Sequence, residues 1–506
     1  MDQTEAVTAL RRIVRAPGVG CRRLVLGGTS IVAALVAGAA VGAAQGQLAP
    51  GLEFQVNTYT VGDQAYPAAC GNAQGHFVVV WESADQDGSG NAVRARRYDQ
   101  NGAALSGELA VNTYTPGDQQ LPAVACAPTG DFVVAWESYG QDGDDYGIFG
   151  QRFDSTGAAV GGEFQINSYT TDRQRAAAAC SDGAGNFVVV WQSYGQDGDG
   201  YGIFGQRFDG TGATRGGEFQ VNTVTEYSQE YPAVACTPAG DFVVVWQSEV
   251  QDGDGYGVFG QRFTSAGARS GTEFQVNTYT PGSQQLPAIT ADGAGNFVVV
   301  WESYDDQDGD GYGVFGQRFT SAGAPSGTEF QVNTYTAYSQ EKPAIAASSS
   351  GDFTVAWSSG QDSDGYGVFA RHFTGSGAPD GGEFQVNRYT LGDQGAVSDQ
   401  GHVLAVAAGG NGSFLLVWQS TGVTVPAQDG SGAGIFAQRY SAGPAACPGD
   451  CNGDGAVTIN ELVVGVAIGL GNAPVSRCPA FDRNADGTVA IAELIAAVDA
   501  DLGGCP

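Results

Sequence analysis

Apolar runs and turn-forming residues alternate along most of the chain in a unit that returns about every 55 residues. One such unit contains four apolar runs, at residues 187–191, 202–208, 218–222 and 232–236. Glycine, aspartate, asparagine and proline separate the runs, and these residues are typical of turns between strands. All seven tryptophans end the first run of their unit: Trp81, Trp136, Trp191, Trp246, Trp301, Trp357 and Trp418. The pattern therefore predicts seven units of four short strands each.

Seven units of this size favour a mainly-β fold, a seven-bladed β-propeller of four-stranded blades over residues 51–441. The run at 187–191 is apolar at every position, so we expect its strand to be buried on both faces, between neighbouring blades. A solenoid is the competing architecture, but its units are mostly shorter or helical, and no helical periodicity occurs before residue 455. We expect the small residues at 232–236 to form the strand nearest the axis.

The order of the runs also predicts how the ring closes. The first repeat opens with Glu-Phe-Gln-Val-Asn at residues 53–57, whereas the last repeat ends at residues 436–440 without a copy of that run. We therefore expect residues 53–57 to supply the outer strand of the last blade. This strand would join the two ends of the ring.

Residues that recur in every unit have a structural and a functional interpretation. We expect the tryptophans to pack in the core, with a sugar-binding surface as the alternative. An arginine also recurs in the Gln-Arg-Phe run, and a repeated hydrogen bond or ring stack is favoured there over an anion site. These arginines are Arg97, Arg152, Arg207, Arg262, Arg318, Arg371 and Arg439.

An acidic loop joins the tryptophan run to the Gln-Arg-Phe run, and it reads Gln-Asp-Gly-Asp-Gly at residues 196–200 and 251–255. Asp-Gly is common turn chemistry, and a turn is the leading interpretation. The alternative is calcium, which prefers oxygen ligands. One aspartate holds the same position in every unit: Asp87, Asp142, Asp197, Asp252, Asp308, Asp362 and Asp429.

Cysteines occupy near-equivalent places in the first four units, at Cys70, Cys126, Cys180 and Cys236. We expect buried thiols, because equivalent positions on neighbouring blades would lie beyond the reach of a disulfide. The three histidines fall at unrelated places in their repeats, so the sequence shows no histidine cluster.

The N-terminal segment has the features of a secretory signal peptide at residues 1–46. Five arginines precede an apolar stretch at 24–41, and small residues follow at 42–46. An uncleaved membrane anchor is the alternative. We predict a secreted protein, extracellular or at the cell surface, with no stable membrane span after cleavage.

Two twelve-residue segments near the C-terminus, 450–461 and 482–493, place oxygen donors at positions 1, 3, 5 and 12 and glycine at position 6. This is the spacing of an EF-hand loop, which surrounds Ca²⁺ with oxygens and ends in a bidentate glutamate. Position 7 contributes a backbone carbonyl, and a water would take position 9 of the second loop. We predict calcium as the cofactor, with these ligand positions: Asp450, Asn452, Asp454, Ala456, Thr458, Glu461, Asp482, Asn484, Asp486, Thr488, Ala490 and Glu493.

Each loop is followed by an apolar helical stretch, at residues 462–470 and 494–502, and neither has a convincing helix before it. The arrangement resembles the dockerin family over residues 447–505. The resemblance implies a small α-helical, calcium-folded docking module at 447–506, after a linker at 442–446. Its implied partner is a cohesin-like protein or a cell-surface component.

The segment departs from the dockerin pattern at two places. Glu461 and Glu493 stand where dockerins commonly have aspartate, and positions 10 and 11 of the loops lack the hydroxyl residues that the family uses in recognition. Calcium binding therefore carries over at the matching ligands, whereas these departures put cohesin recognition in doubt. Four cysteines in this exported segment, Cys447, Cys451, Cys478 and Cys505, predict two disulfides, with three pairings open.

Charge and composition exclude some partners. The formal net charge is −32, from 22 Lys and Arg against 54 Asp and Glu. Nucleic acids and anionic membranes are bound by clustered lysine and arginine, so neither is an expected partner. One lysine and three histidines leave few side chains for acid–base chemistry near neutral pH.

The sequence supports two main classes of function. The leading interpretation is a secreted calcium-binding propeller that acts as a binding, docking or scaffold component, toward carbohydrate or protein. The alternative is a polysaccharide-degrading enzyme, a glycoside hydrolase or lyase, whose catalytic domain is the propeller. An enzyme would place unique carboxylates, histidines or arginines at one mouth of the ring. The repeats are nearly uniform, with deviations in the first and last units, which favours binding. A structural component of the cell surface is a third interpretation.

Overall fold

A computed structural model describes most of the chain in two compact units, Met1–Ala49 with Ala442–Pro506, and Pro50–Ser441. The described residues are 24–26, 29–31, 48–304, 307–362, 364–395, 403–422, 428–441, 449, 451, 457–473, 477–478, 481, 489, 494 and 497–498. Most of them belong to the larger unit.

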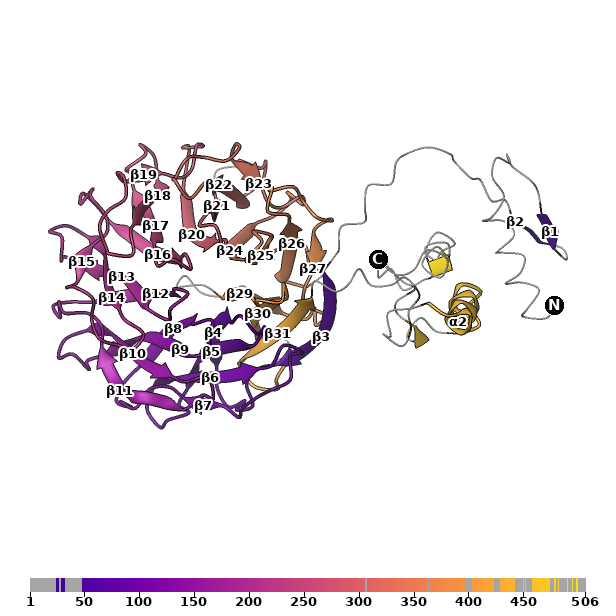
Figure 1. Cartoon of the computed structure of the whole chain (residues 1–506), viewed down its shortest axis with the longest axis horizontal. Helices are drawn as coiled ribbons and strands as arrows, with labels where there is room; N and C mark the ends of the chain where they lie inside the picture. The colour runs from indigo at the N-terminus through magenta and orange to yellow at the C-terminus, as the bar shows by residue number, and fades with distance from the viewer. Residues whose placement is uncertain are drawn as a thin grey trace. The chain divides into compact units, whose positions relative to one another are not determined.

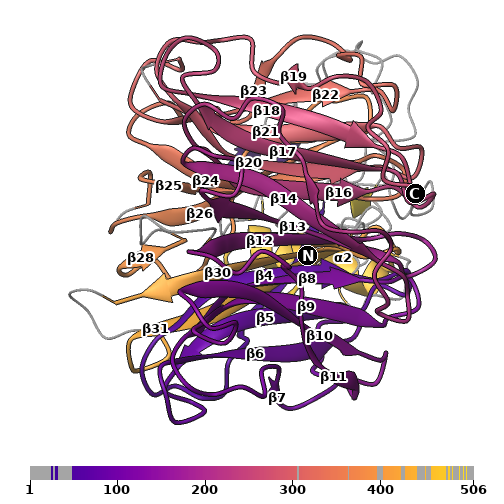
Figure 2. The same ribbon diagram turned by 90° about the vertical axis from the view of Figure 1, so that its left-hand side faces the viewer.

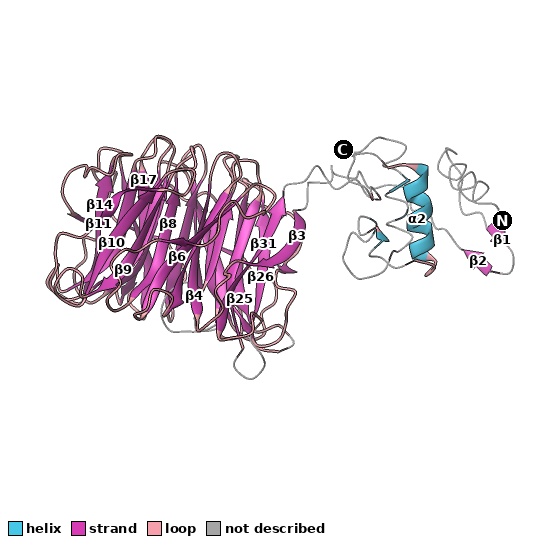
Figure 3. Cartoon of the chain, turned by 90° about the horizontal axis from the view of Figure 1, so that it is seen from below, coloured by secondary structure: helices cyan, strands magenta, loops and turns pink. Residues whose placement is uncertain are grey.

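The larger unit is a ring of seven antiparallel sheets (Figure 1). Seen from the side, the strands run across the thickness of the ring, and the loops gather at its two faces (Figure 2; Figure 3). The first strand of each blade lies nearest the axis, where it contacts the first strands of the neighbouring blades. The predicted seven-bladed propeller with four-stranded blades is confirmed.

The strands of each blade follow from the axis outward. Blade 1 is β4 (Gln64–Gly71), β5 (Phe77–Ala84), β6 (Asn91–Tyr98) and β7 (Leu109–Ala110). Blade 2 is β8 (Gln119–Cys126), β9 (Phe132–Tyr139), β10 (Tyr146–Phe153) and β11 (Ala159–Gln165). Blade 3 is β12 (Gln174–Ser181), β13 (Phe187–Tyr194), β14 (Tyr201–Phe208) and β15 (Phe219–Gln220). Blade 4 is β16 (Gln229–Cys236), β17 (Phe242–Glu249), β18 (Tyr256–Phe263) and β19 (Phe274–Gln275).

The remaining blades have the same order. Blade 5 is β20 (Gln284–Ala291), β21 (Phe297–Ser303), β22 (Gly313–Phe319) and β23 (Phe330–Gln331). Blade 6 is β24 (Gln340–Ala347), β25 (Phe353–Ser359), β26 (Gly367–Phe373) and β27 (Phe384–Gln385). In blade 7, β28 (Asp393–Gln394) and β29 (Leu404–Ala408) both pair with β30 (Phe414–Thr421), which is followed by β31 (Ala433–Ser441) and β3 (Ala49–Gln55).

Strand β3 closes the ring, as the repeat order predicts. It is the outer strand of blade 7, although it comes from the other end of the propeller sequence (Figure 1). The Val56 amide donates to the Ile435 carbonyl at 2.8 Å. The Glu53 carboxylate accepts from the Gln428 side chain at 2.6 Å and from the Arg388 amide at 2.6 Å. These contacts join the first and last repeats.

The core lies between the blades. All seven tryptophan side chains are fully buried, and strand β13 is buried at every residue except Tyr194. One apolar cluster joins Val78 and Val93 of blade 1 to Val134 and Trp136 of blade 2. Packing between blades therefore explains the uninterrupted apolar runs, and the tryptophans are core residues, not a sugar-binding surface.

The recurrent arginines form hydrogen bonds between blades. Arg207 donates to the Ser265 carbonyl of the next blade at 2.9 Å, and Arg262 donates to the Ser321 carbonyl at 3.1 Å. The predicted structural hydrogen bond is confirmed at these positions. Blade 6 departs from the series because His372, not Arg371, faces the second strand at this register position. The assignment of Arg371 to the series is therefore wrong.

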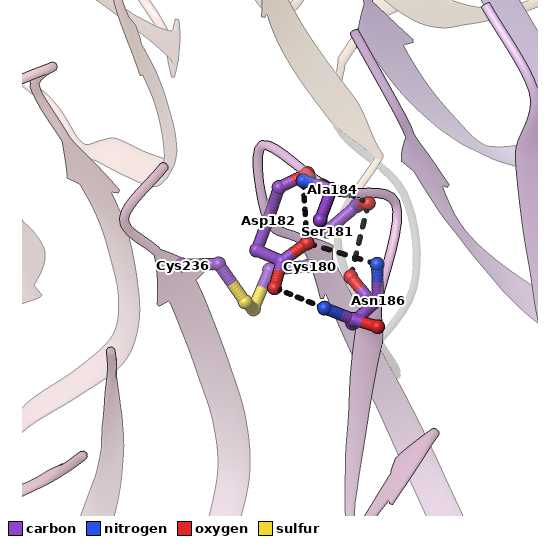
Figure 4. The surroundings of a disulfide bond; sticks show 6 residues. All are labelled: Cys180, Ser181, Asp182, Ala184, Asn186 and Cys236. Carbon is purple, nitrogen blue, oxygen red and sulfur yellow. Dashed lines mark hydrogen bonds between the residues drawn. A yellow bond between two sulfur atoms is a disulfide. The ribbon is translucent and has the colours of Figure 1, made fainter. Parts of the chain in front are cut away.

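Two disulfides join neighbouring blades, so the prediction of buried thiols is wrong. Cys70 is bonded to Cys126 and Cys180 to Cys236, with Cα atoms 5.6 and 5.5 Å apart. These distances are within disulfide reach because the inner strands converge near the axis. Figure 4 shows the second bridge beside Asp182, whose carboxylate accepts hydrogen bonds that hold the following turn.

The smaller unit contains the helix α2 (Ile459–Gly469) and two short paired strands, β1 (Leu24–Leu26) and β2 (Thr29–Ile31). The Thr458 side chain and the Glu461 carboxylate form a capping box at the helix start. Cys451 is bonded to Cys478. Cys447, Cys505 and most of the predicted signal peptide lie outside the described residues. None of the described helices is long and apolar enough to cross a membrane.

Candidate functional site

The acidic loops are held by side-chain hydrogen bonds that recur around the ring. In blade 3, the Asn222 side chain donates to Asp197 at 3.0 Å and to Gln229 at 2.9 Å, while its oxygen accepts from the Ile203 amide. The same aspartate–asparagine contact occurs at Asp87, Asp142, Asp197, Asp252, Asp308, Asp362 and Asp429. Burial raises the pKa of Asp197.

The second aspartate, which the loops of blades 2 to 6 contain, has a different partner. Asp199 accepts from the Tyr227 amide at 3.0 Å, and Asp310 accepts from the Tyr338 amide at 3.1 Å. These carboxylates therefore fix the loop that leads into the next inner strand. The described residues contain no group of three or more His, Cys, Asp or Glu arranged to hold a metal. The contacts assign these loops a bracing role, in line with the turn interpretation.

Three glutamates lie directly after the tryptophan, at Glu82, Glu137 and Glu302, where other blades have glutamine or serine. Each is buried and accepts the amide of a residue in the next blade: Leu121 at 3.2 Å, Ala176 at 2.6 Å and Lys342 at 2.7 Å. Gln192 accepts from the Tyr231 amide in the same way, at 2.8 Å.

Burial raises the pKa of Glu82 to about 8 and that of Glu302 to about 7. These two carboxyl groups nevertheless remain inside the interface between blades, where a substrate cannot reach them. A neutral glutamine serves as the acceptor in other blades, so the position needs an acceptor oxygen but no charge. The three buried glutamates are therefore structural residues.

One exposed tyrosine stands on the same face of each of five consecutive blades, 2 to 6. Their side chains are 45 to 64% exposed, and they are Tyr139, Tyr194, Tyr227, Tyr304 and Tyr338. This set is called the tyrosine arc. The corresponding loops of blades 1 and 7 expose the aliphatic residues Val61 and Leu391 instead. The arc therefore covers part of the ring and breaks its sevenfold symmetry.

Two different sequence positions supply the arc, and they are neighbours in space. In blades 2, 3 and 5 the tyrosine ends or follows the second strand, whereas Tyr227 and Tyr338 lie in the loop before the inner strand. A Cβ on Gly117 would lie 3.3 Å from the Tyr139 ring, and a Cβ on Gly360 would lie 3.1 Å from the Tyr338 Cβ. In blades 2, 5 and 6 the neighbour of the tyrosine is glycine, whereas blade 3 has Asp172 and blade 4 has Glu249 at that place.

The loop tyrosines have unfavourable backbone angles. Tyr227 and Tyr338 have φ values of 61° and 62°, a left-handed conformation that Gly117 and Gly282 adopt at the same position in blades 2 and 5. Such a conformation costs a residue with a side chain roughly 1–3 kcal/mol, whereas glycine adopts it freely. The chain therefore carries an exposed aromatic ring where glycine would be more stable, which points to a function for the ring.

A carboxylate pair lies in blade 4, at the centre of the arc. Glu249 occupies the position that Tyr139 holds in blade 2, and Tyr256 is its partner across the strand pair. The Tyr256 hydroxyl donates to Glu230 at 3.4 Å. Burial raises the pKa of Glu230, and the charge of Glu249 raises it further. The two carboxyl groups are therefore close enough for the charge of Glu249 to favour the protonated form of Glu230.

Two arginines of blade 3 on the same face pair with acidic residues of blade 2. Arg175 forms an ion pair with buried Glu137 at 3.0 Å, and its guanidinium lies 5.0 Å from the centre of the Tyr146 ring. Arg173 forms a more exposed ion pair with Asp145 at 3.1 Å. Charged deviations between repeats thus also occur on the tyrosine-arc face in blades 3 and 4, at Arg175 and Glu249. The first and last units do deviate, as expected, but the deviations are not confined to them.

The predicted calcium ligands fall mostly outside the described residues. Thr458 and Glu461 are described, and the others are not. The Glu461 carboxylate is buried and accepts from the Cys451 amide at 2.9 Å and the Thr458 amide at 2.7 Å. It therefore points across its own loop, as the last ligand of an EF-hand loop would. The calcium set stays a prediction.

The tyrosine arc was not predicted from the sequence. Its signal is present in the repeats, because Tyr227 and Glu249 replace the glycine and tyrosine of blade 2. The two positions are 22 residues apart, and only the fold brings them together. A comparison of the repeats that paired these positions would have found the arc.

Comparison with known proteins gives distant structural similarities only. No protein-family model and no curated protein matches the chain. An α-L-arabinanase from Penicillium chrysogenum, complexed with arabinobiose, is 15% identical over 62% of this chain and 92% of its own, with a TM-score of 0.42. A family PL25 ulvan lyase is 10% identical over 76% of this chain and 95% of its own, with a TM-score of 0.45. A Dyadobacter fermentans protein of unknown function is 10% identical over 63% and 98%, with a TM-score of 0.43. Similarities at this level do not transfer an activity.

Proposed function

We propose that the propeller binds a polysaccharide along the tyrosine arc and cleaves it at the carboxylate pair of blade 4. The observation that carries the proposal is the exposed tyrosine on each of blades 2 to 6, supplied from two sequence positions. A tyrosine offers an apolar ring face and a polar hydroxyl, which match the apolar faces and the hydroxyl groups of sugars. An arc of five such rings suits an extended chain of sugar units.

The carboxylate pair supports cleavage by general acid and base. Burial and the neighbouring Glu249 charge favour the protonated form of Glu230, which suits a group that donates a proton to the glycosidic oxygen. Glu249 would then act as the base or nucleophile. The bond from the anomeric carbon to the glycosidic oxygen breaks, and water supplies the hydroxyl group and the proton of the two products.

This proposal reverses the order of the two sequence interpretations. An enzyme was expected to place unique charged residues at one mouth of the ring. Glu249 and Arg175 meet that condition, and Glu230 has one counterpart, Glu341 in blade 6. Non-catalytic binding is the second candidate function. It is favoured by the bracing contacts of Glu82, Glu137 and Glu302, which leave most of the unusual carboxylates without access to a ligand.

An assay of the intact protein against a panel of soluble polysaccharides separates cleavage from non-catalytic binding. Affinity electrophoresis measures binding, and the release of reducing ends measures cleavage. Binding with release of reducing ends supports the proposal, whereas binding without release in any member of the panel supports the non-catalytic function. If Tyr194→Ala and Tyr304→Ala bind each polysaccharide as the wild type does, the arc is not the binding surface.

For the smaller unit we propose a calcium-loaded docking module that uses the twelve predicted ligand positions. The support is the EF-hand spacing, together with the buried Glu461 carboxylate directed across its loop. Its proposed partner is a cohesin-like protein or a cell-surface component. The three disulfides of the described chain fit an extracellular protein.

Removal of the first ligand of each loop tests the calcium proposal. Asp450→Ala with Asp482→Ala should abolish calcium-induced protection of the C-terminal module from proteolysis, because metal binding and folding are coupled in such small domains. The propeller should stay folded. A C-terminal module that is equally protected with calcium and with chelator would contradict the proposal.

A further inference from the structure

Blade 6 repeats one half of the blade 4 site. The sequence Tyr-Ser-Gln-Glu occurs at 227–230 in blade 4 and at 338–341 in blade 6. In both blades the glutamate accepts a hydrogen bond from a tyrosine at the start of the third strand, Tyr256, or directly before it, Tyr366. The Tyr366 hydroxyl donates to Glu341 at 2.8 Å, and the Tyr256 hydroxyl donates to Glu230 at 3.4 Å. Blade 5, which lies between them, has glutamine in place of the glutamate.

The second half of the blade 4 site is missing from blade 6. Gly360 stands where blade 4 has Glu249, so blade 6 lacks the second carboxylate. A Cβ at Gly360 would lie 3.1 Å from the Tyr338 Cβ, so the glycine makes room for the tyrosine. Blade 6 therefore keeps an aromatic ring and a tyrosine-bound carboxylate but has no pair for acid–base cleavage.

The backbone that carries Tyr338 is fixed in the same way as that of Tyr227. The Tyr338 amide donates to Asp310, and its left-handed φ of 62° matches that of Tyr227. Tyr338 is also the most exposed ring of the arc, at 64%. An exposed ring on a fixed backbone offers a surface for stacking. Glu341 and Tyr366 add hydrogen-bonding groups in the same blade.

We propose that blade 6 is a second, non-catalytic sugar subsite, which binds a neutral part of the same polysaccharide away from the cleaved bond. This inference rests on the proposed function of the tyrosine arc. A neutral sugar is favoured because Glu341 accepts hydrogen bonds from hydroxyl groups, and because this carboxylate and Asp310 repel an acidic sugar. Tyr338 stacks on the sugar ring, and Tyr366 orients the Glu341 carboxylate.

The test compares a long polymer with a short oligosaccharide that fills blade 4 alone. Tyr338→Ala should raise the KM for the polymer about tenfold, the equivalent of one lost aromatic contact, and leave kcat/KM for the short substrate unchanged. Tyr338→Trp should retain the wild-type KM. Leu391→Ala, which removes an exposed apolar side chain from the matching loop of blade 7, is the control and should change neither value.

The outcomes separate this inference from the proposed function. If polymer and short substrate are cleaved and Tyr338→Ala changes neither KM, the blade 6 subsite is refuted and the cleavage site stands. If no polysaccharide is cleaved, the cleavage proposal fails, and the inference is tested by direct binding. The affinity of each protein for the polymer is then compared. A weaker affinity of Tyr338→Ala, with Leu391→Ala unchanged from the wild type, supports the subsite, and equal affinities of all three proteins refute it.

Discussion

The interior of the blades and the tyrosine-arc face differ in how strictly they follow the repeat. Inside, every blade has a fully buried tryptophan and an aspartate–asparagine contact, and the ring closes with the same contacts in its last blade. On the face, equivalent positions hold tyrosine, glycine or glutamate. The difference teaches that positions which build the ring are repeated, whereas positions that differ between blades are available for recognition and chemistry. Substitutions on the two sides test this division.

The largest effect is expected inside the ring. Trp191→Ala removes a fully buried side chain and should lower the free energy of unfolding by about 3–5 kcal/mol. Tyr194→Ala, three residues away on the exposed face, is the matched control and should change it by no more than about 0.5 kcal/mol. Denaturant unfolding followed by fluorescence measures both. Similar losses in the two variants would remove the distinction between interior and face.

The buried glutamates predict a pH dependence. Glu82 has a pKa of about 8 in the folded protein against 4.5 as its ordinary value, so the protonated form is favoured in the folded state. The contribution of Glu82 to the free energy of unfolding is therefore fully present below pH 4.5 and is lost as the pH rises through about 8. Glu82→Gln should abolish this loss, which is on the order of a few kcal/mol between about pH 5 and about pH 9.

The converse substitution sharpens the same prediction. Gln192 accepts the Tyr231 amide where Glu82 accepts the Leu121 amide, so Gln192→Glu should introduce a new loss of stability at high pH. Thermal unfolding across the same pH range measures both variants. If the wild type and Glu82→Gln lose stability equally over this range, Glu82 is not the source of the pH dependence.

The disulfides between blades predict a further effect on the ring. Cys180→Ser with Cys236→Ser should lower the free energy of unfolding by about 2–4 kcal/mol, because the bridge closes a loop of more than fifty residues in the unfolded chain. Unfolding midpoints of oxidised wild type and variant, each with and without reductant, measure the effect. A variant as stable as the oxidised wild type would show that the bridge adds nothing to the ring.

Much of the interior could be predicted from the sequence, because the buried strands produce a periodic pattern of apolar residues. The tryptophan spacing predicted the seven blades, and the missing last copy of residues 53–57 predicted the closing strand. The disulfides could not be predicted, since their feasibility depends on how closely the inner strands approach the axis. The face was not predicted, because its two positions lie 22 residues apart in each of blades 2 to 6 and the sequence alone does not show that they are neighbours in space.

The central claim is that the blade 4 carboxylate pair acts on a polysaccharide bound along the arc. It is tested most directly by measuring reducing-end release from a bound polysaccharide with the wild type, Glu230→Gln and Glu226→Gln. The last variant makes the same change of charge in an exposed loop residue of the same blade. The account predicts that Glu230→Gln still binds the polymer but releases reducing ends at least about 100-fold more slowly, while Glu226→Gln behaves as the wild type. Equal release by all three proteins would contradict it.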